Sequence, residues 1–333
     1  MKKRQLGSMG PLISAIGIGA LSFSDFYGPS DTKKSHAILT AALDLGIDHL
    51  DTSNVYGAGI SEERIGLFLA NQGAGGSSLF KIATKASIRR TEDGGNAFDN
   101  SPAHLTGELE KSLRRLGVEV IDLYYMHRRD PAYEIEEVVG TLAGFVKEGK
   151  VKQFGFSEIA PTSLARAAAV HPIAAVQSEY SLSTRAPELG LVQKTAEVGA
   201  AFVAFCPVGR SLLTDTPHSR DQAETMPFLK NNPRFMEPNL SLNTAATDGF
   251  RKLASEMGVA TSSLAIAWLL HQGLHILPIP GTRSVKHLKE LAKGVELELS
   301  VSDLTAIEQQ LPLGWAHGDR YSVSQWAGPE RYC

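Results

Sequence analysis

Four residues that could carry acid-base chemistry stand at or just beyond the ends of strand-like runs. Asp51 ends the apolar run 47–51, and Tyr56 follows in a polar loop. Lys85 ends a second run of this kind, and His127 directly follows a third. Because the carboxyl ends of parallel strands meet at one edge of a sheet, an acid, a phenol, an ammonium and an imidazole are expected to lie together there.

These residue types suit the reduction of a carbonyl group by hydride. A carbonyl that receives hydride on its carbon develops negative charge on its oxygen and must gain a proton. Tyr56 is the candidate proton donor, and Lys85, held cationic by Asp51, would lower the pKa of the tyrosine from about 10. A neutral His127 would donate a hydrogen bond to the carbonyl oxygen. No H-E-x-x-H or similar motif is present, so no metal is expected.

Each of these residues could also have a simpler role. Taken singly, Asp51 could cap a turn and Lys85 could be an ordinary helix-facing charge. His127 could be a hydrogen-bonded strand-end residue, and Tyr56 could be a surface aromatic residue. A lysine at a strand end in a pocket is also the nucleophile that a Schiff-base aldolase needs, which is a second possible role for Lys85.

Hydrophobic periodicity predicts a regular alternation of strands and helices that would position these residues. A hairpin is expected over 4–13. The predicted strands are 14–19, 47–51, 79–85, 120–126, 151–156, 174–177, 201–206 and 275–279. The predicted helices are 31–45, 61–70, 102–116, 134–148, 163–170, 188–198, 244–257, 261–272, 284–293 and 302–310. Segment 207–239 has weak periodicity and reads as a long loop, either a functional lid or disordered.

About eight strands alternating with helices favour one (β/α)8 TIM barrel over an open doubly wound sheet. We expect a single domain over 1–333, with an N-terminal hairpin before the barrel and a C-terminal helix and aromatic tail after it. A dinucleotide-binding sheet would carry G-x-G-x-x-G after its first strand, and the segment 17–22 departs from that pattern at its last position.

Composition narrows the class of protein. The chain has 333 residues, of which 43% are hydrophobic and 21% charged, as expected for a globular protein with a sizeable core. With 33 basic and 36 acidic residues the net charge is −3, which argues against a nucleic-acid partner. No apolar run is long enough to span a membrane, and no export signal is visible. The two cysteines, Cys206 and Cys333, are too few for a disulfide framework, so a cytoplasmic location is expected.

A phosphate site is indicated after the last predicted strand. The residues Ile-Pro-Gly-Thr-Arg-Ser at 279–284 lead from that strand into a helix, whose N-terminal backbone amides favour a phosphate. Barrels often hold phosphate groups after strands seven and eight. A helix cap followed by an unrelated arginine would produce the same pattern.

The chain resembles the aldo-keto reductase family from about residue 6 to 310. The residues that resemble the active-site tetrad of that family, in the contexts DTSNVYG, IATK and DLYYMH, are Asp51, Tyr56, Lys85 and His127. The segment 279–283 is similar to the I-P-G-T-R cofactor motif of the family, whose arginine contacts the adenosine 2′-phosphate. The resemblance therefore implies NADP(H), with Gly281, Thr282 and Arg283 at the cofactor, and NADPH-dependent reduction of a small-molecule aldehyde or ketone to an alcohol.

The resemblance implies further cofactor contacts. Ser157 and Gln177 would hydrogen-bond the nicotinamide carboxamide. Phe205 stands where the family usually stacks a tyrosine under the nicotinamide ring. Val208 and Arg210 would lie near the pyrophosphate.

Three positions depart from the family pattern. Glu158 stands where an asparagine often contacts the carboxamide, and Cys206 replaces a common serine. The usual Glu-Asn pair that binds adenine is Glu290-Leu291 in this chain, so that only Glu290 is expected at the adenine.

The same resemblance leaves function and substrate partly open. Some relatives are regulatory cofactor-binding subunits, the β subunits of potassium channels, so a non-catalytic role is an alternative. The run H-R-R-D-P at 127–131 is similar to bacterial members that act broadly on aldehydes, pyridoxal among them. The oligomeric state is not predicted. The aromatic residues expected to wall a substrate pocket, together with segment 207–239, are Phe23, Phe26, Tyr27, Trp315 and Trp326.

Overall fold

Eight parallel strands form the central sheet of the protein. The computed structural model describes residues 1–91 and 95–331, and Cys333 lies outside them. The hydrogen-bonded order of the sheet is β12-β11-β10-β9-β8-β5-β4-β3, with parallel pairing throughout. The strands are β3 Ile18–Gly19, β4 His49–Asp51, β5 Lys81–Ala86, β8 Ile121–Met126, β9 Val151–Ser157, β10 Ala175–Glu179, β11 Ala201–Phe205 and β12 Ile276–Pro278.

Two backbone hydrogen bonds join the first and last of these strands. The Gly17 amide donates to the Pro278 carbonyl at 2.9 Å, and the Gly19 amide donates to the Pro280 carbonyl at 3.0 Å. A Cβ on Gly19 would lie 2.6 Å from the Ile279 carbonyl oxygen, so the close approach of β3 to β12 requires glycine there. The sheet thus curls round on itself, and the predicted (β/α)8 barrel is confirmed.

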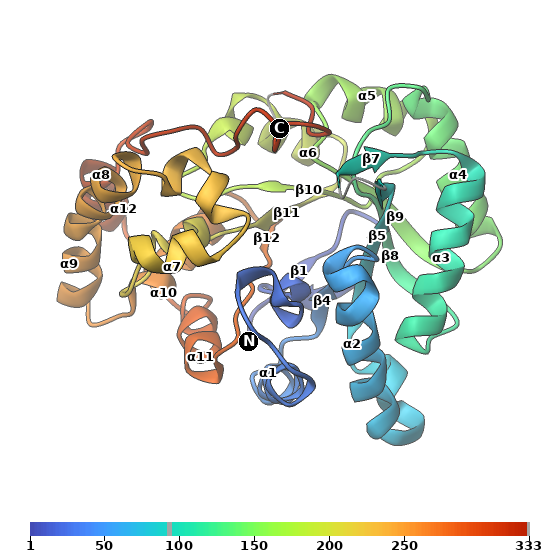
Figure 1. The fold of residues 1–333 in the computed structure, drawn as a ribbon, viewed down its shortest axis with the longest axis horizontal. Coiled ribbons are helices and arrows are strands. Elements are labelled where there is room, and N and C mark those ends of the chain that lie inside the picture. The colour runs from blue at the N-terminus through green and yellow to red at the C-terminus, as the bar shows by residue number, and fades with distance from the viewer. Residues whose placement is uncertain (92–94, 332–333) are drawn as a thin grey trace.

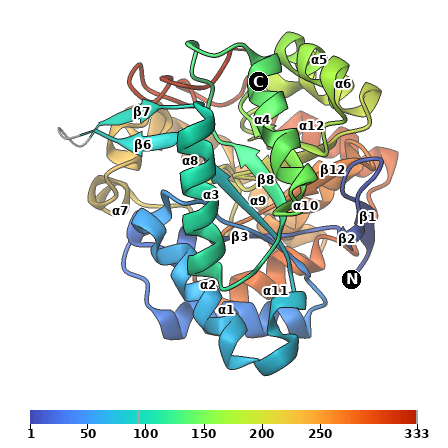
Figure 2. The same cartoon turned by 90° about the vertical axis from the view of Figure 1, so that its right-hand side faces the viewer.

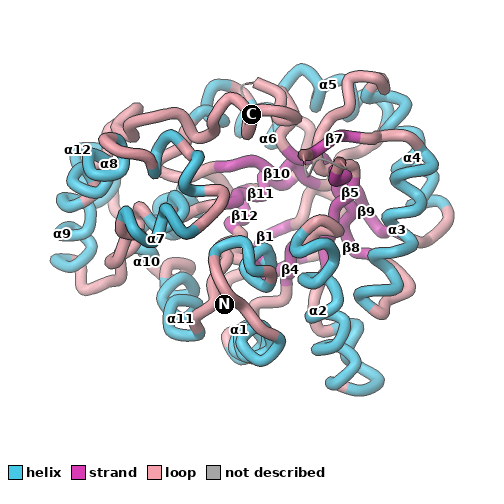
Figure 3. Tube along the Cα trace, viewed as in Figure 1, coloured by secondary structure: helices cyan, strands magenta, loops and turns pink. Residues whose placement is uncertain are grey.

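Helices cover the outside of the barrel (Figures 1 and 3). They are α1 Thr32–Asp44, α2 Ile60–Asn71, α3 Pro102–Leu116, α4 Ile135–Lys147, α5 Pro161–Val170, α6 Leu191–Glu197, α7 Arg220–Thr225, α8 Asn239–Ala246, α9 Asp248–Glu256, α10 Thr261–His271, α11 Val285–Lys293 and α12 Val301–Gln310. Side-chain caps fix several starts, because Asp31, Ser101 and Ser284 each accept a hydrogen bond from a first-turn amide. Within the described ranges no single helix could cross a membrane by length and composition, although the bent pair Asn239–Glu256 and Thr261–His271 passes when taken together.

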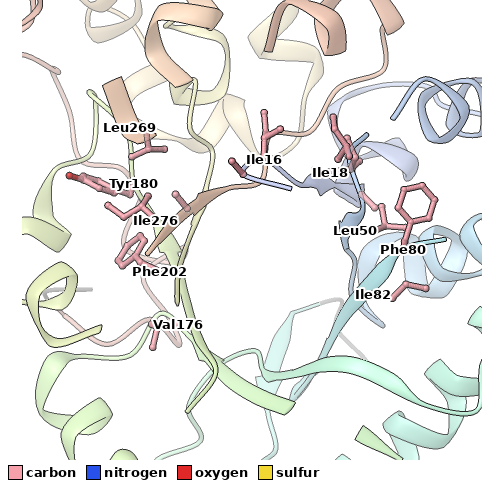
Figure 4. Close-up of a cluster of buried hydrophobic side chains, with 14 of the residues drawn as sticks. Ile16, Ile18, Leu50, Phe80, Ile82, Val176, Tyr180, Phe202, Leu269 and Ile276 are labelled. Carbon is pink, nitrogen blue, oxygen red and sulfur yellow. The ribbon is translucent and has the colours of Figure 1, made fainter. Parts of the chain in front are cut away.

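The main hydrophobic core lies between the strands and the helices. In Figure 4 the strands form a ring, and labelled side chains such as Ile18, Leu50 and Phe202 point outward from it. These three side chains are fully buried. Because successive strand residues face opposite sides, the alternate residues point into the barrel, which is how strand-end polar groups reach one site.

Two hairpins lie at opposite sides of the barrel in Figure 2. The N-terminal one, β1 Lys3–Gln5 with β2 Leu12–Ser14, was expected from the sequence and is confirmed. Its neighbours Leu6 and Ile13 are fully buried in the cluster that fills the barrel interior. The second, β6 Ile88–Arg90 with β7 Asn96–Phe98, follows β5 and was not predicted.

Segment 207–239, which the sequence left open as a lid or a disordered loop, is ordered in the structure. It contains α7 and short 3-10 turns, and its apolar side chains pack on one another. They form a separate cluster: Leu212, Ala223, Met226, Leu229, Phe235 and Leu240. The apolar residues of this segment do not recur at helical spacing, so hydrophobic periodicity did not predict its helix and turns. The single helix predicted over 244–257 is wrong, because the structure has α8 and α9 on either side of Thr247.

The C-terminal tail 312–331 crosses the end of the barrel where the strands finish, in red in Figure 1. Arg320 donates to both carboxylate oxygens of Glu158, at 3.1 and 2.6 Å, and both side chains are buried. The Glu330 amide donates to the Glu158 carbonyl at 2.9 Å, and the Trp315 indole donates to the Leu182 carbonyl at 2.8 Å. The tail is therefore fixed over the edge at which the candidate catalytic residues lie.

Candidate active site

A buried ion pair lies at the C-terminal ends of β4 and β5. The Lys85 side chain is fully buried and Asp51 is 1% exposed. The Lys85 ammonium donates to the Asp51 carboxylate, to the Thr52 carbonyl at 2.8 Å and to the Tyr56 hydroxyl at 3.3 Å. Burial lowers the pKa of Lys85, and the Asp51 charge opposes this shift. The three donated bonds use all three ammonium hydrogens, so the geometry holds Lys85 in its charged form.

Tyr56 begins a short 3-10 segment, Tyr56–Gly59, that turns from the strand end into α2. The turn needs positive backbone angles at Gly57 and Gly59, with φ of 62° and 102°. Burial raises the pKa of Tyr56, and so does the Asp51 carboxylate, while Arg128 lowers it. The lowering of this pKa that we expected from Lys85 is therefore not found, and Tyr56 is a neutral phenol, which is the form that can donate a proton.

His127 follows β8 and is 6% exposed. Its ring meets the Tyr56 ring edge to face, with centroids 6.1 Å apart and an interplanar angle of 80°. Burial holds the pKa of His127 well below its usual 6.5, and Arg128 and Lys85 lower it further. The imidazole is therefore neutral. The Ser53 hydroxyl is 3.2 Å from Nδ1, and if Ser53 donates there, the proton is on Nε2. Asp51, Tyr56, Lys85 and His127 thus come together as predicted from the sequence.

Gln177 and Ser157 lie side by side at the ends of β10 and β9, where their Cα atoms are in register. Both side chains are buried. The Gln177 amide nitrogen donates to the second oxygen of Asp51 at 2.7 Å. Since an ionised carboxylate only accepts, the amide oxygen of Gln177 points away from Asp51 and can accept from another group. Gln177 is therefore attached to the ion pair as well as placed where a carboxamide was expected.

The residues predicted near the nicotinamide ring and pyrophosphate lie at and after the end of β11. Phe205 is partly exposed and packs on the barrel-interior cluster, and Val208 is partly buried. Arg210 is paired with Glu179 at 2.7 Å and donates to the Tyr27 hydroxyl at 2.8 Å. Its guanidinium is therefore already held in place by the protein.

The predicted phosphate-binding residues lie at the start of α11. Gly281 and Arg283 are exposed, and Thr282 is 8% exposed with its hydroxyl accepting from the Ser284 amide at 3.1 Å. Among the residues that the structure describes, Arg283 donates one long bond, 3.4 Å, to the Pro29 carbonyl. A Cβ on Gly28 would lie 2.8 Å from the Arg283 guanidinium, so the loop after β3 runs close beside this arginine.

Glu290 is half-buried on α11, with Lys286 3.7 Å away. Leu291, which departs from the family pattern, is 3% exposed and belongs to the main core. An apolar residue at this position therefore packs inward on the helix.

The structure explains another departure from the family pattern. Glu158 is fully buried and its carboxylate is bound by Arg320 of the tail. Burial alone would raise the pKa of Glu158, but the charges of Arg320 and Arg128, together with the hydrogen bonds from Arg320, outweigh this and hold the pKa below its usual value, so the carboxylate stays charged. The side chain that replaces the carboxamide-binding asparagine thus serves to hold the tail.

Two residues of the site were not found from the sequence. Ser53 contacts His127, and its position two residues beyond Asp51 in the same loop was the available signal. Arg128 donates to the Ser157 hydroxyl at 3.0 Å. Its place directly after His127 was visible in the sequence, but the direction of its side chain was not.

The aromatic residues predicted to wall a substrate pocket differ in their surroundings. Phe23 is 1% exposed and belongs to the main core. Phe26 and Tyr27 form an aromatic group with Phe228, with centroid distances of 4.8 and 5.4 Å from Phe26. Trp326 stacks on Tyr321 in the tail at 5.4 Å. Trp315 is half-buried against the cluster of segment 207–239.

Curated relatives match almost the whole chain. The chain is 36% identical over 313 residues to the aldo-keto reductase yakc of Schizosaccharomyces pombe, whose name includes NADP(+), with 93% of this chain and 92% of that protein covered. It is 36% identical over 321 residues to the probable aldo-keto reductase 1 of Glycine max, with coverages of 95% and 91%.

Solved structures share the fold. A glycerol dehydrogenase from Gluconobacter oxydans matches with a TM-score of 0.81 at 27% identity, covering 93% of this chain and 94% of that one. The holo form of an aldo-keto reductase from Bacillus halodurans matches with a TM-score of 0.77 at 25% identity, covering 98% and 99%. A family model described as the Aldo/keto reductase family covers residues 15–311. The protein therefore belongs to the aldo/keto reductase family and is an oxidoreductase.

Proposed function

We propose that the protein reduces aldehydes and ketones to alcohols with NADPH, and that Tyr56 donates the proton. One observation carries this proposal: the fully buried Lys85 ammonium lies between the Asp51 carboxylate and the Tyr56 hydroxyl, beside a neutral His127. Membership of the aldo/keto reductase family supports the same reaction class.

The cofactor is NADP(H), in line with the name of the Schizosaccharomyces pombe relative. The residues present fit it. Arg283 is exposed and makes one long hydrogen bond among the described residues, so its guanidinium can bind a 2′-phosphate. It directly precedes the N-terminus of α11, where backbone amides also favour a phosphate. Ser157 and Gln177 would hold the carboxamide, and Phe205 the face of the nicotinamide ring. When bound, NADPH supplies the hydride, because no side chain can deliver one.

The side chains of the protein then supply one proton and stabilise the negative charge that develops on the substrate oxygen. As charge grows on the substrate oxygen, the Nε2 hydrogen of His127 stabilises it and fixes its direction. Tyr56 transfers its hydroxyl proton to that oxygen and becomes a phenolate. The raised pKa of Tyr56 keeps the proton available at neutral pH, while the alkoxide is a stronger base still. The Lys85 ammonium, 3.3 Å from the tyrosine oxygen, stabilises the phenolate until a proton returns.

The Schiff-base alternative fits this geometry poorly. A nucleophilic lysine needs a free lone pair, whereas the Lys85 nitrogen donates to three oxygens, from Asp51, Thr52 and Tyr56. Burial also raises the pKa of the Cys206 thiol to about 12, which removes it as a competing nucleophile. A measurement of turnover distinguishes a reductase from a regulatory subunit that only binds the cofactor.

We also propose that 1–333 acts as one domain in the cytoplasm. The continuous barrel supports a single domain, and the low cysteine count supports a reducing compartment. We propose no nucleic-acid partner, because the chain has slightly more acidic than basic residues and a net charge of −3.

Replacing Arg283 by alanine should weaken NADPH binding by about 10- to 100-fold and change NADH binding little. A charge-assisted contact to the 2′-phosphate is worth about 1.5–3 kcal/mol. The dissociation constants of both cofactors are measured by quenching of protein fluorescence. Lys289→Ala, which removes an exposed cation one turn into the same helix, is the matched control. Equal weakening of both cofactors, or none, contradicts the assignment.

Replacing Tyr56 by phenylalanine keeps the ring and removes the proton donor. NADPH should still bind, and the chemical step should slow by about 100-fold or more. Lys85→Met should have nearly the same effect, and the double variant should cost little more than either change, because the two act as one unit. Single-turnover loss of NADPH absorbance measures the step. A Schiff-base enzyme would instead tolerate Tyr56→Phe, and a regulatory subunit would show negligible turnover before mutation.

The pH dependence of reduction follows from the shifted pKa values. The pKa of His127 is well below 6.5, so its protonation should cause no loss of rate down to about pH 6. At alkaline pH the rate should fall, because Lys85 has a lowered pKa and works in its protonated form. A profile of kcat from about pH 5.5 to 10 tests this. A loss of rate centred near pH 6.5 would mean that His127 titrates normally.

A further inference from the structure

Arg128 has a backbone that is fixed in position beside the tetrad. Its amide donates to the Ser87 hydroxyl at 2.8 Å, and its carbonyl accepts from the Asn100 side chain at 3.0 Å. The residue directly follows His127, whose amide donates to the Ala86 carbonyl at 2.7 Å. The start of the Arg128 side chain is therefore held as firmly as the catalytic strand end.

The Arg128 guanidinium extends from the end of β8 to the end of β9. One terminal nitrogen, Nη1, donates to the His127 carbonyl at 2.7 Å and to the Ser157 hydroxyl at 3.0 Å. The side chain is half-buried. It thus lies along the edge between the tetrad and the residues expected to hold the nicotinamide carboxamide.

Arg128 differs from the other buried cations at this end of the barrel because it has no carboxylate. Lys85 is paired with Asp51, as described above. Arg210 and Arg234 both lie within ion-pair distance of Glu179, and Arg320 is paired with Glu158. Over 1–91 and 95–331, no carboxylate lies within ion-pair distance of Arg128, and its Nε and Nη2 atoms make no hydrogen bond.

The charge of Arg128 acts on the reacting groups and also on the buried Glu158 carboxylate, whose pKa it lowers. It lowers the pKa values of Tyr56, Lys85 and His127. A half-buried guanidinium is seldom left unpaired, because removing it from water costs free energy that a partner anion normally offsets. The free Nε and Nη2 hydrogens form a planar fork of the kind that binds a carboxylate through two hydrogen bonds.

We propose that Arg128 forms an anion subsite for the substrate, so that the enzyme prefers carbonyl compounds that carry a carboxylate group. This rests on the proposed reductase function. The carbonyl oxygen of the substrate is held by His127, and the carboxylate is bound by the adjacent Arg128. The cofactor phosphates are assigned elsewhere, to residues after β11 and β12, so the subsite at the ends of β8 and β9 is left to the substrate.

The test compares acids with their methyl esters as substrates. We would measure kcat/KM with saturating NADPH for 3- and 4-carboxybenzaldehyde and for the corresponding methyl formylbenzoates. Wild-type protein should prefer at least one acid over its ester by about 10-fold or more. Arg128→Met should bring the acid-to-ester ratio of kcat/KM to about 1, and the ratio is the readout because the lost charge beside Tyr56, Lys85 and His127 changes the rates of acid and ester by a common factor. Arg128→Lys, which keeps the charge but not the fork, should keep part of it.

Two controls separate the subsite from other effects. Arg90→Met removes an exposed cation from the β6–β7 hairpin and should leave the acid preference unchanged, which excludes a general effect of net charge. NADPH binding to Arg128→Met should be unchanged within about threefold. If NADPH affinity falls by the same factor as the acid preference, the arginine serves the cofactor and the proposal is overturned.

The remaining outcomes are also decisive. A wild-type enzyme that prefers both esters, or an Arg128→Met variant in which acid and ester activity fall together, overturns the subsite. Terephthalate, a dicarboxylate that cannot be reduced, gives a readout without turnover, and its dissociation constant from NADPH-loaded protein should rise about 10-fold in Arg128→Met by calorimetry. If wild-type protein reduces none of the aldehydes, the proposed function fails, and terephthalate binding alone then decides whether Arg128 binds carboxylates.

Discussion

The buried ion pair between Lys85 and Asp51 is the interaction on which the rest of the site depends. Taking two charges out of water costs several kcal/mol each, and their attraction offsets this only if the remaining hydrogen-bonding groups are satisfied. Here the Thr52 carbonyl and the Tyr56 hydroxyl accept the other two hydrogen bonds of the Lys85 ammonium. The Gln177 amide donates to the second oxygen of the Asp51 carboxylate. The hydrogen bonds that offset the cost of burying the ion pair therefore also hold the Tyr56 phenol beside Lys85 in the active site.

The fold surrounds this pair with further buried charges that connect distant segments. Glu158 after β9 binds Arg320 of the tail, and Glu179 at the end of β10 binds Arg210 of the segment after β11. Tail and segment are thus attached to the strands that end at the active site. Each attachment neutralises an anion. Arg128, which has no carboxylate within ion-pair distance among the described residues, is therefore a feature of the site itself and not of a generally basic surface.

Sequence patterns predicted the barrel and the tetrad because both depend on local signals: alternating apolar runs, and polar residues at their ends. They could not predict partners chosen by three-dimensional packing. Gln177 and Asp51 are 126 residues apart, and Glu158 and Arg320 are 162 apart, so nothing in either local sequence marks the contact. The order of segment 207–239 was missed for a related reason, since its apolar residues pack on one another without a helical or strand period.

The central claim is that the carboxylate of Asp51 keeps Lys85 charged and thereby makes Tyr56 an effective proton donor. Asp51→Asn removes that charge with almost no change in shape. Hydride transfer is followed in a single turnover by the loss of NADPH absorbance with an aldehyde at pH 7. The account predicts that the variant binds NADPH normally and transfers hydride at least about 10-fold more slowly, because the buried lysine then loses its proton. An unchanged rate of transfer at pH 7 would contradict it.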